Sequence, residues 1–280
     1  MSYQQVFAAN VLVVDDNTGD SVNIDGALQA GGHTVTTVTN DFAGGSNPTL
    51  QGALSQYDAV YWTASGEFGV GGFHGDAATF TNLNSYVNNG GCVFITGFDS
   101  LAGPNNSPII TFVGGSGVFD SPIPPGAIVN VANALTTGVR DIRTLVPLNP
   151  VFDMDNVLEA LDADTTGVTP GAPNSWAWTL KEPVGTNGKI AYVSNGQFAT
   201  NQEPNWLVTT NDGFGAYNAA LLNFALACSE SLVGGELLPI DTTALMLAGL
   251  QSSAIWMLPV LAGAAGAGAY YIKTRMNKDN

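Results

Sequence analysis

Three short apolar runs in this sequence are each followed by acidic, amide or hydroxyl side chains. These side chains are Asp15, Asp16 and Asn17 after the first run, Ser65 and Glu67 after the second, and Asp99 after the third. Carboxylate and amide oxygens are the ligands that the hard cations Mg²⁺ and Ca²⁺ prefer. The pattern therefore predicts a polar ligand site built from all six residues, with Asp15, Asp16 and Asp99 as ligands of a Ca or Mg ion. The alternative is that these acids cap helices and solubilise loops.

A hydrolase would use Ser100 and His74. Ser100 stands in the turn after the third run, and His74 lies in the glycine-rich stretch 66–75. A serine nucleophile needs a base within hydrogen-bond reach, and the only other histidine, His33, begins a different predicted strand. No G-x-S-x-G elbow is present. The alternatives are a hydrolase that uses Ser100 with His74 or a metal-bound water, and a turn serine with an unrelated loop histidine.

The predicted elements that position these residues are alternating strands and helices. The runs 11–14, 59–63 and 92–96 are continuous and apolar, which is typical of strands buried on both faces of a parallel sheet. Further strands are predicted over 33–38 and 189–194. Helices are predicted over 21–30, 76–88 (with Asp76 as N-cap) and 215–229.

Alternating strands and helices predict a flavodoxin-like, doubly wound α/β fold with a mostly parallel sheet. In such sheets ligands bind beyond the carboxyl ends of the strands, where the strand order reverses. The six site residues are therefore expected to converge at one edge.

One further segment and one set of aromatic residues could each have a function. Residues 162–167 (DADTTG) begin like a calcium-binding loop, but Pro173 occupies the twelfth position, so a turn is predicted. Five aromatic residues could form a stacking surface for a sugar or could belong to the core. They are Trp176, Trp178, Phe198, Trp206 and Tyr217.

The composition bounds the partners and the redox chemistry. The formal net charge is -16, and the acidity belongs to residues 1–240. Nucleic acid is excluded as a partner, because binding its phosphates requires Lys and Arg to displace counterions. Cys92 and Cys228 are the only cysteines, so either they form the single possible disulfide or they are two buried thiols.

The C-terminal segment 245–273 predicts one transmembrane helix. No charged residue occurs from Leu245 to Ile272, and Lys273, Arg275 and Lys278 follow. About 20 residues cross a ~30 Å hydrocarbon core at ~1.5 Å per residue. Basic residues favour the cytoplasmic side, which predicts a cytoplasmic tail (274–280), a linker (231–244) and an extracytoplasmic domain (1–230) held at the lipid bilayer.

The first strand, VLVVDDN (11–17), resembles that of response-regulator receivers. The position where a receiver has its phospho-accepting aspartate is Thr63 in this chain. A receiver function is therefore rejected.

A longer resemblance, over about residues 8–229, is to class I glutamine-amidotransferase-like domains, especially ThuA-like and secreted members. It rests on VLVVDDN, LSQYDAVYW (54–62), LNSYVNNGGCVFITG (83–97), NALTTGV (133–139) and GKIAYVSNGQF (188–198). The resemblance implies a flavodoxin-like sheet and, in catalytic members, a cysteine in the turn that is Gly97–Ser100 here. Cys92 lies at the other end of that strand.

The residues after the domain, LPIDT (238–242), then an apolar run and basic residues, resemble the anchoring tails of surface proteins, without the Gly of the LPxTG form. The combined prediction is a cell-surface, membrane-anchored, catalytically degenerate domain that acts as a binding or structural module. Its ligand would be a small molecule, a glycan or a protein.

Overall fold

The structure is a computed structural model of the 280-residue chain. It describes residues 8–16, 22–42, 46–64, 76–96, 101, 107–121, 127–128, 131–143, 154–158, 163–168, 175–176, 178–193 and 216–232. All of these belong to the first of the two units into which the chain divides, Met1–Val233 and Gly234–Asn280.

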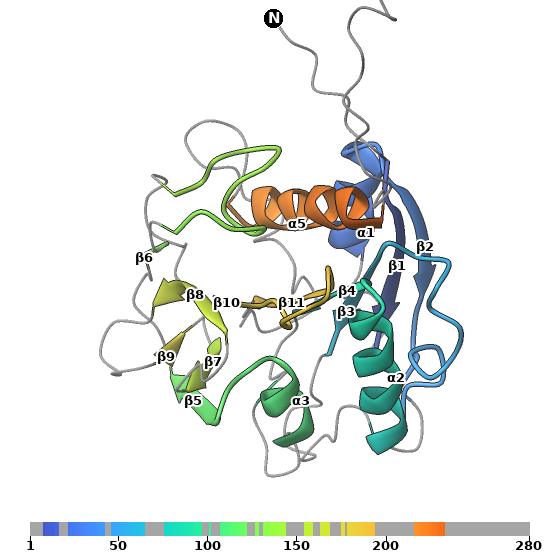
Figure 1. The fold of residues 1–280 in the computed structure, drawn as a ribbon, viewed down its shortest axis with the longest axis horizontal. Coiled ribbons are helices and arrows are strands. Elements are labelled where there is room, and N and C mark those ends of the chain that lie inside the picture. The colour runs from blue at the N-terminus through green and yellow to red at the C-terminus, as the bar shows by residue number, and fades with distance from the viewer. Residues whose placement is uncertain are drawn as a thin grey trace, which may run out of the picture. The chain divides into compact units, whose positions relative to one another are not determined.

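Five parallel strands form one side of an eight-stranded sheet (Figure 1). They are β1 (Asn10–Asp15), β2 (Thr34–Val38), β3 (Ala59–Thr63), β4 (Cys92–Thr96) and β11 (Lys189–Val193). Their spatial order is β2-β1-β3-β4-β11, which is the flavodoxin-like order. The predicted α/β fold and all five of its predicted strands are confirmed.

Shorter strands extend this sheet and form a second one. β10 (Trp178–Lys181), β8 (Asp164–Val168) and β6 (Ala127–Ile128) continue the large sheet with antiparallel pairing. β5 (Gly117–Ser121), β7 (Met154–Leu158) and β9 (Ser175–Trp176) form a three-stranded antiparallel sheet.

The turn predicted over residues 162–167 is wrong for most of its length. Asp164 begins β8, and Thr165 pairs with Thr179 of β10. Asp and Gly are typical turn residues, but Thr165 and Thr166 are β-branched and fit a pleated strand. Pairing with β10 decides the structure here, and local composition does not.

Helices cover both faces of the sheet (Figure 1). On one face α1 (Val22–Ala30) contacts α5 (Ala216–Leu232), and on the other α2 (Ala77–Asn88) contacts α3 (Ser107–Phe112). The three predicted helices are confirmed, whereas α3 was not predicted. Asp76 caps α2 as expected, because its Oδ1 accepts a hydrogen bond of 2.9 Å from the Thr79 backbone N–H.

Neighbouring residues of the buried strands β1, β3, β4 and β11 pack into different cores. Val11 and Val13 of β1 pack with α1 and α5, whereas Leu12 and Val14 pack with α2 and α3. In β3, Tyr61 belongs to the first core and Trp62 to the second. Burial on both faces explains why these strands are continuous apolar runs without a polar alternation.

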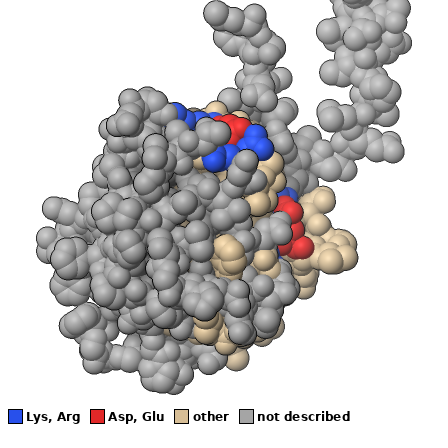
Figure 2. All heavy atoms as spheres, turned by 90° about the vertical axis from the view of Figure 1, so that its left-hand side faces the viewer, with Lys and Arg blue, Asp and Glu red and all other residues tan. Residues whose placement is uncertain are grey.

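Basic and acidic side chains lie next to one another on the face drawn in Figure 2. Arg143 donates from Nε to Asp141 Oδ1 over 2.9 Å, and this donation lowers the pKa of Asp141 to about 2. Lys189 Nζ lies 3.6 Å from Glu182 Oε1. The described basic residues in these two contacts are therefore paired with acids.

Among the described residues, no helix has the length and apolar character needed to cross a bilayer. The predicted transmembrane segment 245–273 and the tail 274–280 lie outside the described residues. The predicted linker 231–244 begins inside α5, which continues to Leu232.

Candidate functional site

Three polar residues form a row at the carboxyl edge of the sheet. Asp15 ends β1 and stands beside Thr63 of β3, which stands beside Thr96 of β4. All three are fully buried. The Thr63 hydroxyl lies 3.2 Å from Asp15 Oδ1 and 3.2 Å from the Val14 carbonyl oxygen, and its single hydrogen can be donated to either oxygen. This row lies at the switch point, because β2 and β3 lie on opposite sides of β1.

Asp16 connects this edge to the loop between β2 and β3. Its Oδ1 accepts hydrogen bonds of 2.9 Å from Trp62 Nε1 and 2.6 Å from Asn47 Nδ2. Its backbone N–H donates to the Thr63 carbonyl over 3.2 Å. With 3% of its surface exposed, Asp16 is a buried acceptor for two neutral donors. Its observed role is to fix the neighbouring loop.

Asp41 fixes the same loop from its other end. Its two carboxylate oxygens lie 3.1 and 3.2 Å from the Thr49 backbone N, which donates to them. The Asp41 backbone N–H donates to the Asp15 carbonyl over 3.0 Å. The loop is therefore bound to the carboxyl end of β1 through both Asp41 and Asn47.

Two buried acceptors near this edge have no hydrogen-bond partner among the described residues. They are the Asn47 Oδ1 and the Thr96 Oγ1. A buried polar atom without a partner destabilises the fold by about 1–3 kcal/mol.

The structure brings Asp15 and Asp16 to the predicted edge. The other predicted site residues lie outside the described residues, namely Asn17, Ser65, Glu67, His74, Asp99 and Ser100. Within the described part of the chain, no group of three or more His, Cys, Asp or Glu side chains is placed to hold a metal ion. The Ca or Mg site and the hydrolase that uses Ser100 and His74 stay predictions.

The aromatic residues that were candidates for a stacking surface do not form one in the described structure. Trp178 is fully buried in the first core, and Trp176 is half-buried in β9. The side chain of Tyr217 and the residues Phe198 and Trp206 lie outside the described part. Trp178 is a core residue, as the alternative reading held.

His33 lies at the opposite edge of the sheet, just before β2. Its Nδ1 accepts a 3.1 Å hydrogen bond from the Ala9 backbone N–H, and only 6% of the residue is exposed. Burial lowers the pKa of His33, while the nearby Asp58 carboxylate raises it. Because Nδ1 accepts, the imidazole is neutral with its proton on Nε2.

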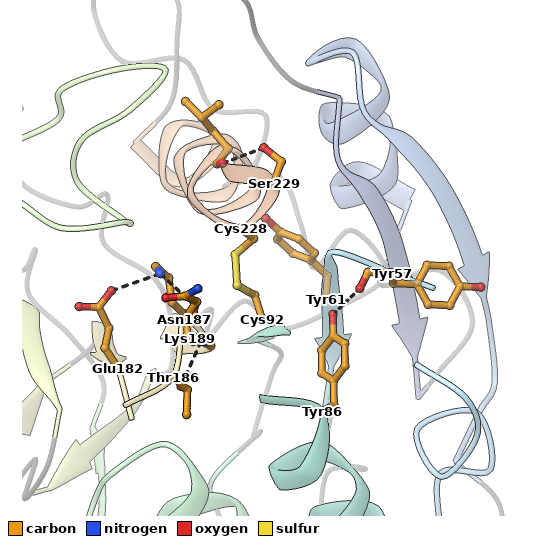
Figure 3. The surroundings of a disulfide bond; sticks show 12 residues. Tyr57, Tyr61, Tyr86, Cys92, Glu182, Thr186, Asn187, Lys189, Cys228 and Ser229 are labelled. Carbon is orange, nitrogen blue, oxygen red and sulfur yellow. Dashed lines mark hydrogen bonds and ion pairs between the residues drawn. A yellow bond between two sulfur atoms is a disulfide. The ribbon is translucent and has the colours of Figure 1, made fainter. Parts of the chain in front are cut away.

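The two cysteines are joined in a disulfide (Figure 3). Cys92 begins β4 and Cys228 lies in α5, with 6.0 Å between their Cα atoms, and both are fully buried. Nearby, the Tyr61 hydroxyl donates to the Leu221 carbonyl over 2.6 Å. Helix α5 is therefore held on the sheet by a covalent bond and a buried hydrogen bond.

No protein family is matched by the chain, and neither is any curated protein. Solved structures do match its fold. A cytoplasmic protein of Salmonella typhimurium LT2 is 11% identical, with a TM-score of 0.52, over 77% of this chain and 98% of that one. A second cytoplasmic protein of Salmonella typhimurium is 15% identical, with a TM-score of 0.50, over 77% and 97%.

A ThuA-like protein of Parabacteroides merdae is also similar. It is 13% identical, with a TM-score of 0.47, over 80% of this chain and 90% of that one. ThuA-like proteins are thus among the structural neighbours. At these identities the likeness concerns the fold, and the expected fold is confirmed as an α/β domain with a flavodoxin-like sheet.

Sequence reasoning missed Asp41, Asn47 and Thr49. A local signal exists, because Asn47 and Pro48 before Thr49 are typical of a turn. Asp41 follows β2, which the predicted strand order places beside β1. Its position at the same edge could therefore have been predicted from the sequence. The contact of Asn47 with Asp16 depends on the loop folding back, and no sequence pattern indicates that.

Proposed function

We propose that this chain is a cell-surface protein, anchored in the membrane by residues 245–273, whose domain is a catalytically degenerate amidotransferase-like fold. The domain serves as a binding or structural module. The observation that carries the proposal is the disulfide between Cys92 and Cys228, which are the chain's only two cysteines. Cysteine nucleophiles react as thiolates, and a sulfur atom in a disulfide is not a thiolate. The chain thus has no thiol for amidotransferase chemistry while this bond is intact.

The disulfide also supports an extracytoplasmic position for the domain. Disulfides form and persist in oxidising compartments, whereas cytosolic thiols are kept reduced. The basic residues Lys273, Arg275 and Lys278 after the apolar segment favour the same orientation, because basic residues stay on the cytoplasmic side of a membrane helix.

The switch-point edge is the proposed binding surface of the module. Asp15, Thr63 and Thr96 lie there in a row, and Asn47 Oδ1 and Thr96 Oγ1 are acceptors without a partner among the described residues. The predicted residues Asn17, Ser65, Glu67 and Asp99 follow the same strands. Because the described residues of this row are fully buried, the proposed contacts with a small molecule, glycan or protein segment are made by the residues that follow these strands.

The orientation can be tested on the full chain with two single-cysteine additions. Val184 is fully exposed in the turn between β10 and β11, and Lys278 belongs to the proposed cytoplasmic tail. A membrane-impermeant maleimide is expected to label Val184→Cys in intact cells and Lys278→Cys only after lysis. The native cysteines are buried in their disulfide and stay unlabelled.

The reverse labelling pattern would refute the proposed orientation. Labelling of unmodified chain without reductant would refute the intact disulfide, and with it the observation on which the proposal rests.

A further inference from the structure

A pocket of about 270 Å³ lies between α2 and the loop before β3. Its lining includes Ser55, Tyr57, Asn82, Ser85, Tyr86 and Asn89. Tyr57 precedes β3, and Asn89 and Gly91 precede β4, so the pocket lies at the amino ends of these strands. It is therefore separate from the switch-point edge, where the same strands end. We propose that this pocket binds a single neutral sugar residue.

The chemistry of the lining selects a neutral ligand. No charged residue lines the pocket, and α2 has no Asp, Glu, Lys or Arg in its 12 residues. An anion would find no basic partner in the lining, and the nearby carboxylate of Asp58, which acts on Tyr86, is not itself part of the lining. Serine hydroxyls can donate and accept hydrogen bonds, and asparagine Oδ1 atoms can accept them, so both kinds of group complement the hydroxyls of a sugar. A polyhydroxylated neutral molecule therefore matches the wall.

The walls of the pocket are already held in place. Asn82 Nδ2 donates to the Leu50 carbonyl over 2.7 Å and to the Gly52 carbonyl over 2.9 Å. The Tyr86 hydroxyl donates to the Tyr57 carbonyl over 3.0 Å (Figure 3). These bonds connect both ends of the loop over residues 50–57 to α2. Because the loop need not be ordered when a ligand enters, little of the binding energy is lost to ordering.

Tyr57 and Tyr86 both line the pocket, but in different ways. A Cβ atom at Gly91 would lie 2.3 Å from the Tyr86 ring, so the ring packs directly on the Gly91 backbone. Tyr57 is half-buried, and Figure 3 shows its ring directed away from the Tyr86 hydroxyl. Tyr86 is therefore a fixed wall of the pocket, because its ring is buried and its hydroxyl is already bonded, whereas the half-buried Tyr57 keeps exposed surface for the C–H groups of a sugar.

The size of the pocket restricts the ligand to about one ring. Sites for drug-sized molecules usually measure about 300–1,000 Å³. A volume of about 270 Å³ is below this range. A longer glycan would therefore place one residue in the pocket and leave the rest in solvent.

The test is saturation-transfer NMR on the full chain with defined sugars. The neutral probes are methyl α-mannoside, methyl β-glucoside and N-acetylglucosamine, and the charged probes are glucuronate and glucosamine. We expect signals from at least one neutral probe and weaker signals from its charged counterpart. Absence of any neutral signal at concentrations on the order of 10 mM would overturn the proposal, because a useful single-ring site has a Kd near or below about 1 mM.

A matched pair of variants on α2 tests whether the sugar binds in this pocket. Ser85 and Asn84 are neighbouring exposed residues, and only Ser85 lines the pocket. Ser85→Glu fills the pocket with a charged side chain and is expected to weaken binding at least tenfold, whereas Asn84→Glu adds the same charge outside it and leaves binding unchanged. Tyr57→Leu is expected to weaken binding as well. Equal binding by Ser85→Glu and Asn84→Glu would show that the sugar binds elsewhere.

Discussion

The indole Nε1 of Trp62 donates a 2.9 Å hydrogen bond to Asp16 Oδ1 at the carboxyl edge of the sheet. The same oxygen accepts a 2.6 Å bond from Asn47 Nδ2. One carboxylate thus joins the end of β1, the strand β3 and the loop between β2 and β3. Both donors are buried, so each depends on Asp16 for its hydrogen bond.

Removing this carboxylate is expected to destabilise the domain. Asp16→Ala leaves the Trp62 and Asn47 donors unpaired in the interior, which lowers the free energy of unfolding by about 2–4 kcal/mol. Asp16→Asn keeps an acceptor oxygen and is expected to have a smaller effect. Urea unfolding of the full chain measures both. Asp141→Ala, which removes an exposed acid paired with Arg143, is the control and should leave stability nearly unchanged.

A double-mutant cycle separates the Asp16–Trp62 contact from other effects of the substitutions. Trp62→Phe removes the Nε1 donor, and its effect should be smaller in the Asp16→Ala background than in the unmodified chain. Strictly additive effects would show that this hydrogen bond contributes nothing to stability.

The central fold follows from local sequence, whereas its periphery does not. The runs VLVV and AVYWT predict β1 and β3, because an uninterrupted apolar run suits a strand buried on both faces. β8 reads DTTGV, in which Asp and Gly resemble a turn, and β9 has only two residues. These strands exist because neighbouring strands pair with them, and pairing over long sequence separations leaves no local signal.

The candidate site shows the same division. The position of Asp15 and Asp16 after a buried strand was enough to place them at the switch point. Asn47 reaches Asp16 only because the intervening loop folds back over β1. The disulfide had one possible pairing, but whether Cys92 and Cys228 meet depends on α5 packing on β4, and the sequence alone left this undecided.

Loss of the Cys92–Cys228 disulfide is expected to destabilise the domain strongly. The cysteines are 136 residues apart. A cross-link over a loop of this length lowers the entropy of the unfolded chain and thereby stabilises the folded state by about 5 kcal/mol at most. Cys92→Ala combined with Cys228→Ala should lower the free energy of unfolding by about 2–5 kcal/mol. Urea unfolding with and without dithiothreitol measures this.

The reductant supplies the control for the double variant. Dithiothreitol should move the unfolding midpoint of the unmodified chain towards that of the Cys92→Ala/Cys228→Ala chain and leave the latter unchanged. Because both sulfurs are buried, reduction should require unfolding and be slow under native conditions. If dithiothreitol leaves the urea-unfolding midpoint of the unmodified chain unchanged, the disulfide does not stabilise the domain.

Protonation of His33 is expected to destabilise the domain as the pH falls. Burial holds the pKa of His33 below the ordinary value of 6.5, although Asp58 acts in the opposite direction. Below about pH 6.5 the unfolded chain therefore binds a proton that the folded chain does not, and stability declines towards the lowered folded-state pKa. The contribution is fully present above pH 6.5. Unfolding free energies measured between pH 8 and pH 5 should show this decline.

Variants of the two histidines identify the source of the decline. His33→Gln should flatten the slope between about pH 6.5 and 5, whereas His74→Gln, at the chain's only other histidine, should retain the His33 contribution. Nitrogen-15 NMR of the imidazole should find the proton on Nε2, since Nδ1 accepts from the Ala9 N–H. An unchanged slope in His33→Gln would assign the pH response to other groups.

The predicted cation site can be tested separately from the structural role of Asp16. A cation present at about 100 times its Kd stabilises the folded state by about 2.7 kcal/mol. We expect Ca²⁺ and Mg²⁺ at millimolar concentration to produce no such shift, because Trp62 and Asn47 already direct hydrogens at Asp16 Oδ1 and repel a cation there. Urea unfolding with either ion, on the unmodified chain and on Asp15→Asn, gives the answer. A stabilisation that disappears in Asp15→Asn would place the cation at the switch point, and a metal-bound water would then become a candidate nucleophile.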